Sequence, residues 1–128
     1  MNNNKKIWGD AMENDSKKYN EILINKFPSL KVEFYKFTDE LDGIKTGSIV
    51  VYEDVFIPYV IKQLNDNNVS EINKITEFIE ELLNSSDEYA FNIAYIAILE
   101  SLKSDDDGKK IKDYLKEKSL KEYNELIY

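Results

Sequence analysis

The chain has 128 residues and a mass of 15.0 kDa, with 42% hydrophobic and 12% aromatic residues, a content that permits a buried core and excludes a wholly disordered chain. It lacks cysteine, histidine and arginine, which removes disulfides, thiolate chemistry and proton transfer by histidine, and we expect neither a metal nor another cofactor. The formal net charge of -8 disfavours direct binding of nucleic acid, because proteins that bind it usually carry a basic surface.

The apolar runs of the sequence indicate a cytoplasmic protein. Residues 1–10 contain no apolar run of the length that a signal peptide needs. The longest apolar stretch, residues 90–99, is far shorter than the ~20 residues that cross a bilayer. We therefore expect one domain spanning residues 1–128, with a flexible polar tail at residues 1–8 and no contact with a membrane.

Two helices are predicted in the first third of the chain. Apolar residues recur at helical spacing up to Pro28, where the first helix should end: Met12, Tyr19, Leu23 and Phe27. Residues 29–41 have a similar spacing, which favours a second helix. Alternate apolar residues between positions 30 and 34 also fit a strand, so residues 30–37 are open to either structure.

An extended connector is predicted near residues 49–52. Asp42-Gly43 and Gly47 mark a turn-rich loop, and the β-favouring run Ile49-Val50-Val51-Tyr52 follows it. The sequence offers this run no obvious second strand, which favours an extended segment packed on helices. A helix is then expected over residues 53–66, either opened or kinked by Pro58.

The second half of the chain has the clearest helical pattern. A helix over residues 70–84 carries a stripe of apolar positions: Ile72, Ile75, Ile79, Leu82 and Leu83. Residues 88–103 are apolar almost all round, which predicts a central helix, and the short link at 84–86 makes the two helices an antiparallel hairpin. Ser85-x-x-Glu88 and Ser119-x-x-Glu122 match the capping box that begins a helix.

These elements predict an all-α fold. Residues 105–108 form a polar break before two short helices, one over residues 109–117 and one from residue 119 onward. The expected architecture is a compact helical bundle or a short stack of antiparallel helix hairpins, with at most one short extended segment near residues 49–52.

Acidic residues are concentrated in the middle of the sequence. Residues 65–107 hold eleven acids and two lysines, whereas residues 1–64 hold ten acids and nine lysines. Such a region would attract a basic partner through its negative field. The candidate partner-binding residues are the acids of this region, with one tyrosine as an aromatic anchor: Glu77, Glu80, Glu81, Asp87, Glu88, Asp105, Asp106, Asp107 and Tyr52. The alternative is a solvated surface whose acids near helix N-termini are favoured by the helix dipole.

Metal binding and catalysis have little support in the sequence. If Gly108 took the glycine position of an EF-hand calcium loop, Lys103 and Tyr114 would stand where the loop needs acidic ligands. Carboxylates are the available general acid–base groups, and Glu80 and Glu100, on the two arms of the hairpin, are the candidate pair. Glu100 is also three residues before Lys103, which fits a simple surface ion pair. We expect no catalytic residue and no enzymatic activity.

Three segments resemble a known class of proteins: VYEDVFIPYV (51–60), EFIEELLNSSDEYAFNI (77–93) and AILESLKS (97–104). They are similar to segments of small acidic helical proteins that act as immunity proteins of bacterial polymorphic toxin and contact-dependent growth inhibition systems. The resemblance covers residues 49–128 and includes no catalytic motif. It implies a non-enzymatic cytoplasmic inhibitor that binds a cognate toxin domain. Many such toxin domains are basic nucleases.

Three hypotheses follow. The first is an immunity protein that neutralises a cognate toxin domain through an acidic surface. The second is a general helical adaptor that contacts its partner through an apolar groove, with binding that depends little on salt. The third is a small enzyme, which would require Glu80 and Glu100 to converge in one pocket.

Overall fold

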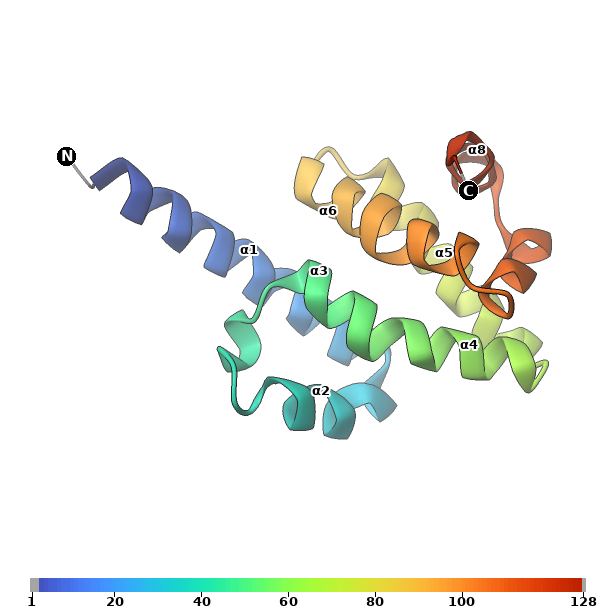
Figure 1. The fold of residues 1–128 in the computed structure, drawn as a ribbon, viewed down its shortest axis with the longest axis horizontal. Coiled ribbons are helices and arrows are strands. Elements are labelled where there is room, and N and C mark those ends of the chain that lie inside the picture. The colour runs from blue at the N-terminus through green and yellow to red at the C-terminus, as the bar shows by residue number, and fades with distance from the viewer. Residues whose placement is uncertain (1–2, 128) are drawn as a thin grey trace. The chain divides into compact units, whose positions relative to one another are not determined.

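The computed structural model describes the backbone of residues 3–127 and the side chains of residues 13–127. Every regular element among these residues is helical, which confirms the predicted all-α fold (Figure 1). None of the described helices is long and apolar enough to cross a membrane.

The chain divides into two compact units, residues 1–51 and residues 52–128. The first unit contains these helices, with 3-10 helices marked η: α1 (Asn3–Lys26), η1 (Pro28–Leu30), α2 (Lys31–Thr38), η2 (Gly43–Lys45) and α3 (Ser48–Val51). The second contains π-helices η3 and η4 and 3-10 helix η5 among its elements: η3 (Tyr52–Phe56), α4 (Ile57–Asn65), α5 (Val69–Asn84), α6 (Glu88–Asn92), η4 (Ile93–Glu100), α7 (Ser101–Lys103), η5 (Gly108–Tyr114) and α8 (Glu117–Glu125). That residues 1–128 form a single domain stays a prediction.

The first unit has its core between α1 and the elements that follow it. Its buried apolar residues include three of those predicted from helical spacing: Tyr19, Leu23 and Phe27. The fourth, Met12, lies outside the described side chains. Helix α1 begins at Asn3, inside the stretch predicted to be a flexible tail; residues 1–2 lie outside the described residues, and the flexibility of the tail stays a prediction.

Residues 30–37 are helical, which settles the choice that the sequence left open. In a strand, Leu30, Val32 and Phe34 would share one face, because side chains alternate along a strand. In the structure Leu30 and Phe34 are buried whereas Val32 is 74% exposed. The spacing of four between the two buried residues is that of one helical turn.

A buried polar cluster ties α1 to the loop that precedes α3. Asn20, which is fully buried, donates through Nδ2 to the carbonyl oxygens of Ile44 at 2.9 Å and Thr46 at 2.6 Å. Its Oδ1 accepts a hydrogen bond of 2.9 Å from the Ser48 hydroxyl. The Ser16 hydroxyl accepts a hydrogen bond from the Ser48 backbone N–H at 3.3 Å. Both donor hydrogens and the acceptor oxygen of the Asn20 amide are thus satisfied, as a buried polar group requires.

The predicted extended segment at residues 49–52 is wrong. Residues 48–51 form α3, and Tyr52 begins the π-helix η3. The buried positions Ser48, Val51, Tyr52 and Val55 follow helical spacing, while Val50 between them is exposed. Burial of one helical face therefore outweighs the modest preference of Ile and Val for strands.

Pro58 is the second residue of α4, which continues directly from the π-helix η3, so it does not open the helix that the sequence predicts over residues 53–66. Proline has no N–H, and its ring collides with the carbonyl group four residues earlier in a regular α-helix. The wider π-helical turn of η3 ends two residues before Pro58 and includes that carbonyl, which belongs to Asp54. The π-helix accommodates the proline at this point.

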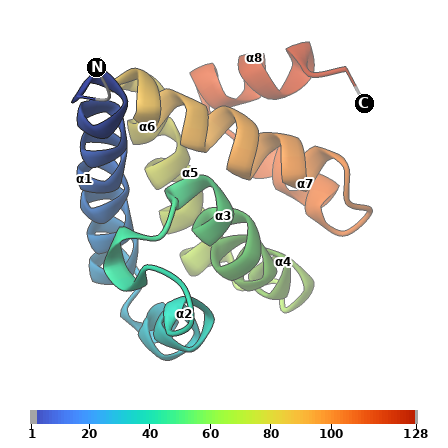
Figure 2. The ribbon, with the colours of Figure 1, turned by 60° about the vertical axis from the view of Figure 1, so that its left-hand side comes forward.

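The second unit is built on the hairpin predicted from the sequence. α5 packs against α6 and η4, and residues 85–87 link α5 to α6. Figure 2 shows α6, η4 and α7 as one continuous helical rod. Its alanines at positions 90, 94 and 97 are all fully buried, as are Tyr52 and Phe56, which form an aromatic cluster with Phe78. Helix α8 packs on α5 and η4.

Candidate partner-binding surface

The whole formal charge of the protein lies in the second unit. Residues 52–128 contain 17 acids and nine lysines, which give a net charge of -8, whereas residues 1–51 contain eight of each and are neutral. A charge of this size on one unit produces a negative field that draws in basic molecules. The positions of the individual acids decide where a partner can reach them.

Helix α5 separates the three acids that the sequence groups together. Glu77 and Glu81 are four residues apart and exposed, so they lie on one outward stripe of the helix. Glu80 is only half-exposed and turns toward α8. The outward stripe therefore presents two of the three predicted partner-binding glutamates.

Glu80 caps the N-terminus of α8. Its two carboxylate oxygens accept hydrogen bonds of 2.9 Å from the backbone N–H groups of Lys118 and Ser119. Partial burial raises the pKa of the Glu80 carboxyl, but hydrogen bonds from Ser119, Lys118 and Asn84 outweigh that effect and hold the pKa below its ordinary value of 4.5. Both Glu80 oxygens are thus engaged within the protein, and a role of Glu80 in binding a partner stays a prediction.

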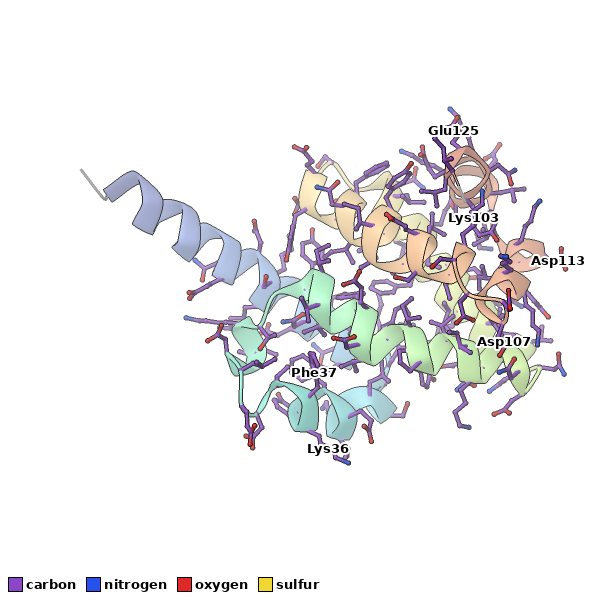
Figure 3. The ribbon with its side chains drawn as sticks, viewed as in Figure 1. Lys36, Phe37, Lys103, Asp107, Asp113 and Glu125 are labelled. Atoms are coloured by element: carbon purple, nitrogen blue, oxygen red, sulfur yellow. The ribbon has the colours of Figure 1, made fainter. Side chains whose placement is uncertain are left out.

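Lys103 performs the opposite role at the other end of α8. Its Nζ donates to the carbonyl oxygens of Tyr123 at 2.7 Å and Leu126 at 2.8 Å, and it lies 4.9 Å from the centre of the Tyr123 ring. Figure 3 shows Lys103 on α7 beside α8. A carboxylate at the N-terminus and an ammonium at the C-terminus both match the helix dipole. The two charges therefore hold α8 in place.

Replacing Glu80 by glutamine should destabilise the second unit by about 1 kcal/mol at pH 7, because one charged acceptor of the cap is lost. A pKa lowered in the folded state adds stability above the unfolded pKa, and this stability is lost as the pH falls through the folded pKa. The deficit of the Glu80→Gln protein should therefore shrink at low pH. Urea unfolding at pH 7 and at successively lower pH tests this, with Glu77→Gln on the outward stripe as the control; an equal loss in both proteins would contradict the capping role.

The acids at the start of α6 divide in the same way. Asp87 is the N-cap: its Oδ1 accepts a hydrogen bond of 3.0 Å from the Tyr89 N–H. Ser85, which the sequence suggested as the cap, instead accepts a 3.0 Å hydrogen bond from the Asp87 N–H. Glu88 is exposed. Of this pair, Glu88 is the more exposed residue.

The three aspartates of the 105–107 loop hold the loop together. Asp105 Oδ1 accepts hydrogen bonds from the backbone N–H groups of Asp107 at 2.9 Å and Gly108 at 2.8 Å. Asp106 and Asp107 form ion pairs with the lysines three residues further on, at 3.8 and 3.6 Å. This loop follows α7, at the opposite end of the hairpin from Glu88, roughly 20 Å away along the helix axis. The predicted acids therefore do not form one continuous patch.

Tyr52 does not belong to the surface. Its exposed fraction is 0%, and its ring lies 5.8 Å from Phe56 and 6.2 Å from Phe78, measured between ring centres. The prediction that it anchors a partner is wrong, because a fully buried side chain packed among aromatic rings has no surface left to offer.

A carboxylate pair that the sequence did not suggest lies between η3 and η4. Glu80 accepts hydrogen bonds from the backbone of α8, whereas the charge of Glu100 affects Glu53 of η3, so the two candidate acid–base residues have different neighbours. Partial burial, then the nearby charges of Asp54 and Glu100, raise the pKa of the Glu53 carboxyl. No group of three or more acids in the described part of the chain is arranged to hold a metal ion.

Comparisons with known proteins identify one family. Neither the curated proteins nor the solved structures contain a match to the chain. The family described as "Domain of unknown function (DUF7674)" matches residues 20–128, a range that includes parts of both units. Because this match covers most of the sequence, the chain belongs to the DUF7674 family.

Proposed function

We propose that this protein is a non-enzymatic immunity protein, which binds a cognate bacterial toxin domain in the cytoplasm and neutralises it. The observation that carries the proposal is the confinement of the net charge of -8 to residues 52–128, which lie within the immunity-protein resemblance over residues 49–128. Glu77 and Glu81 on the outward stripe of α5, with Glu88 beyond them, supply carboxylates that a basic partner can reach.

Inhibition by binding fits the side chains better than catalysis does. Glu80 and Asp105 each accept two backbone hydrogen bonds and are occupied in capping a helix and a turn. A basic nuclease has a positively charged cleft for phosphate groups, and carboxylates can occupy such a cleft in their place. The proposed partner is thus a basic toxin domain, bound with strong dependence on salt.

An adaptor function is the second candidate, and it is favoured by a different surface. Val32 and Tyr35 of α2 are 74% and 50% exposed in the first unit, whose net charge is zero. A partner bound there would respond to apolar substitutions and little to salt. The salt dependence of binding therefore separates the two candidates.

Toxicity rescue tests the proposal directly. The C-terminal domain of the protein encoded immediately upstream would be expressed in bacteria with and without this chain, and surviving cells counted. We expect toxicity that this chain relieves, together with a stable one-to-one complex on gel filtration. A domain that is harmless, or that stays lethal beside soluble full-length chain, would overturn the proposal.

Reversing the charge of Glu77 and Glu81 together should weaken the complex by about ten- to hundredfold, chiefly through slower association at low salt. The control is the double reversal Asp113→Lys and Glu125→Lys, which changes the net charge equally at two exposed acids of the same unit (Figure 3). Isothermal titration at two salt concentrations measures the difference. Equal weakening by both double variants would show that net charge alone matters and would remove α5 from the interface.

A further inference from the structure

One face of the central helical rod is apolar and partly exposed to solvent. Phe91 and Tyr95 are half-buried, and their rings stack with centres 5.8 Å apart and planes 13° from parallel. Ile96, next along η4, is 41% exposed. The opposite face of the rod carries the buried alanines.

Charged groups lie at both ends of this face. Glu100 follows Ile96 by about one turn of η4, and Glu53 and Asp54 lie on η3, which packs against η4. At the other end the Lys118 Nζ lies 5.8 Å from the centre of the Phe91 ring. The face thus has an apolar middle, three carboxylates at one end and one ammonium at the other.

The backbone that builds this face is unusual. Tyr95, Ile96 and Glu100 lie on the π-helix η4, and Glu53 and Asp54 lie on the π-helix η3. π-Helical turns are rare in proteins, and those that occur are often found at functional sites. The π-helical turn of η3 is explained by the need to accommodate Pro58, but η4 contains no proline that would explain its π-helical turns. The pKa of the Glu53 carboxyl is raised, first by partial burial and then by the charges of Asp54 and Glu100. The contribution of the two charges shows that bringing the three carboxylates together costs free energy.

We propose that this face, running from Phe91 through Tyr95 and Ile96 to Glu100 with Glu53 and Asp54 beside it, seats an amphipathic basic segment of the partner. An apolar side chain of the segment packs on Ile96 and the stacked rings, and its lysine or arginine side chains meet the three carboxylates. A basic occupant is required because the three carboxylates repel acidic segments, and an apolar segment would desolvate them without supplying opposite charge. This inference rests on the proposed function in taking the partner to be a basic protein.

Two synthetic peptides probe the face without knowledge of the toxin. One is an amphipathic helical peptide of lysine and leucine, and the other is polylysine of the same charge. Each would be titrated into the full-length chain labelled with ¹⁵N, and amide shifts would be recorded. We expect the lysine–leucine peptide to move the amides of Tyr95, Ile96 and Glu100 and to bind more tightly than polylysine does.

Substitutions then test the two parts of the face separately. Ile96→Ser should weaken binding of the lysine–leucine peptide about tenfold, whereas Val69→Ser, at an exposed aliphatic residue elsewhere in the unit, should not change it. Reversal of Glu53 and Asp54 to lysine should weaken binding of both peptides more than reversal of Asp113 and Glu125 does.

The outcomes separate this inference from the proposed function. Amide shifts confined to Glu77 and Glu81 on peptide titration would overturn the inference while leaving toxin binding through α5 intact. Equal loss of peptide affinity in Ile96→Ser and Val69→Ser would do the same. Rescue from toxicity that Ile96→Ser leaves unimpaired would have the same meaning. Peptide binding at Ile96 without any rescue would support the docking face and count against the immunity function.

Discussion

Replacing Asn20 by aspartate should destabilise the first unit by about 4 kcal/mol at pH 7. Asn20 is fully buried and places its amide nitrogen against two carbonyl oxygens, at 2.9 and 2.6 Å. A carboxylate in the same position would set a negative charge against those oxygens, with no cation among the residues bonded to it. The charged form is therefore untenable, and the variant must fold with a protonated carboxyl.

The size of the effect follows from the cost of that proton. A carboxyl with an ordinary pKa near 3.9 needs about 4 kcal/mol to hold a proton at pH 7. Because the pKa of the introduced carboxyl is raised in the folded state, the penalty is absent below the unfolded pKa and grows as the pH rises. The difference from the parent protein should thus shrink by about 1.4 kcal/mol for each unit that the pH is lowered toward that value.

Urea unfolding followed by circular dichroism, at several pH values between 7.5 and 4.5, measures this difference. The control is Asn25→Asp, the same exchange at an exposed position of α1. That protein should match the parent within about 0.5 kcal/mol at every pH. A loss in Asn20→Asp that stays constant with pH would mean that the loop opens around residue 20 and hydrates the carboxylate.

The sequence was sufficient where a local pattern agrees with burial. The stripe of α5 contains five predicted apolar positions, from Ile72 to Leu83, and all are buried. At residues 49–52 the sequence misled, because β-branched residues favour strands locally. The spacing of Ser48, Val51, Tyr52 and Val55 is helical, and it was the better guide since it reflects the neighbours against which the segment packs.

Much of the candidate surface could not be foreseen from the sequence. Glu77, Glu80 and Glu81 look alike in the sequence, and the role of Glu80 depends on where residues 118 and 119 lie in space. Glu53 and Glu100 are far apart in the sequence and meet through the packing of η3 on η4. Capping of a helix by a distant side chain leaves no signal in the local sequence. The turn in which Asp105 accepts a hydrogen bond from Gly108 does leave one, because an aspartate shortly before a glycine is typical of turns.

The three described glycines should respond to alanine substitution in a graded order, with Gly108 the most sensitive. A Cβ on Gly108 would lie 2.5 Å from the Leu102 carbonyl oxygen and 2.9 Å from its Cα. Both atoms are backbone of a fully buried residue and cannot move aside easily. We expect Gly108→Ala to destabilise the second unit by roughly 3 kcal/mol.

The other two glycines separate this collision from backbone strain. Gly43 has open space around it but a φ of +58°, so alanine there should cost about 1 kcal/mol. Gly47 has neither constraint, and alanine there should be neutral or stabilise by up to about 1 kcal/mol by restricting the unfolded chain. Thermal and urea unfolding of the three variants measures the order. A Gly108→Ala protein as stable as Gly47→Ala would mean that the 105–108 turn moves freely away from Leu102, and its aspartates would then return as candidates for contact with a partner.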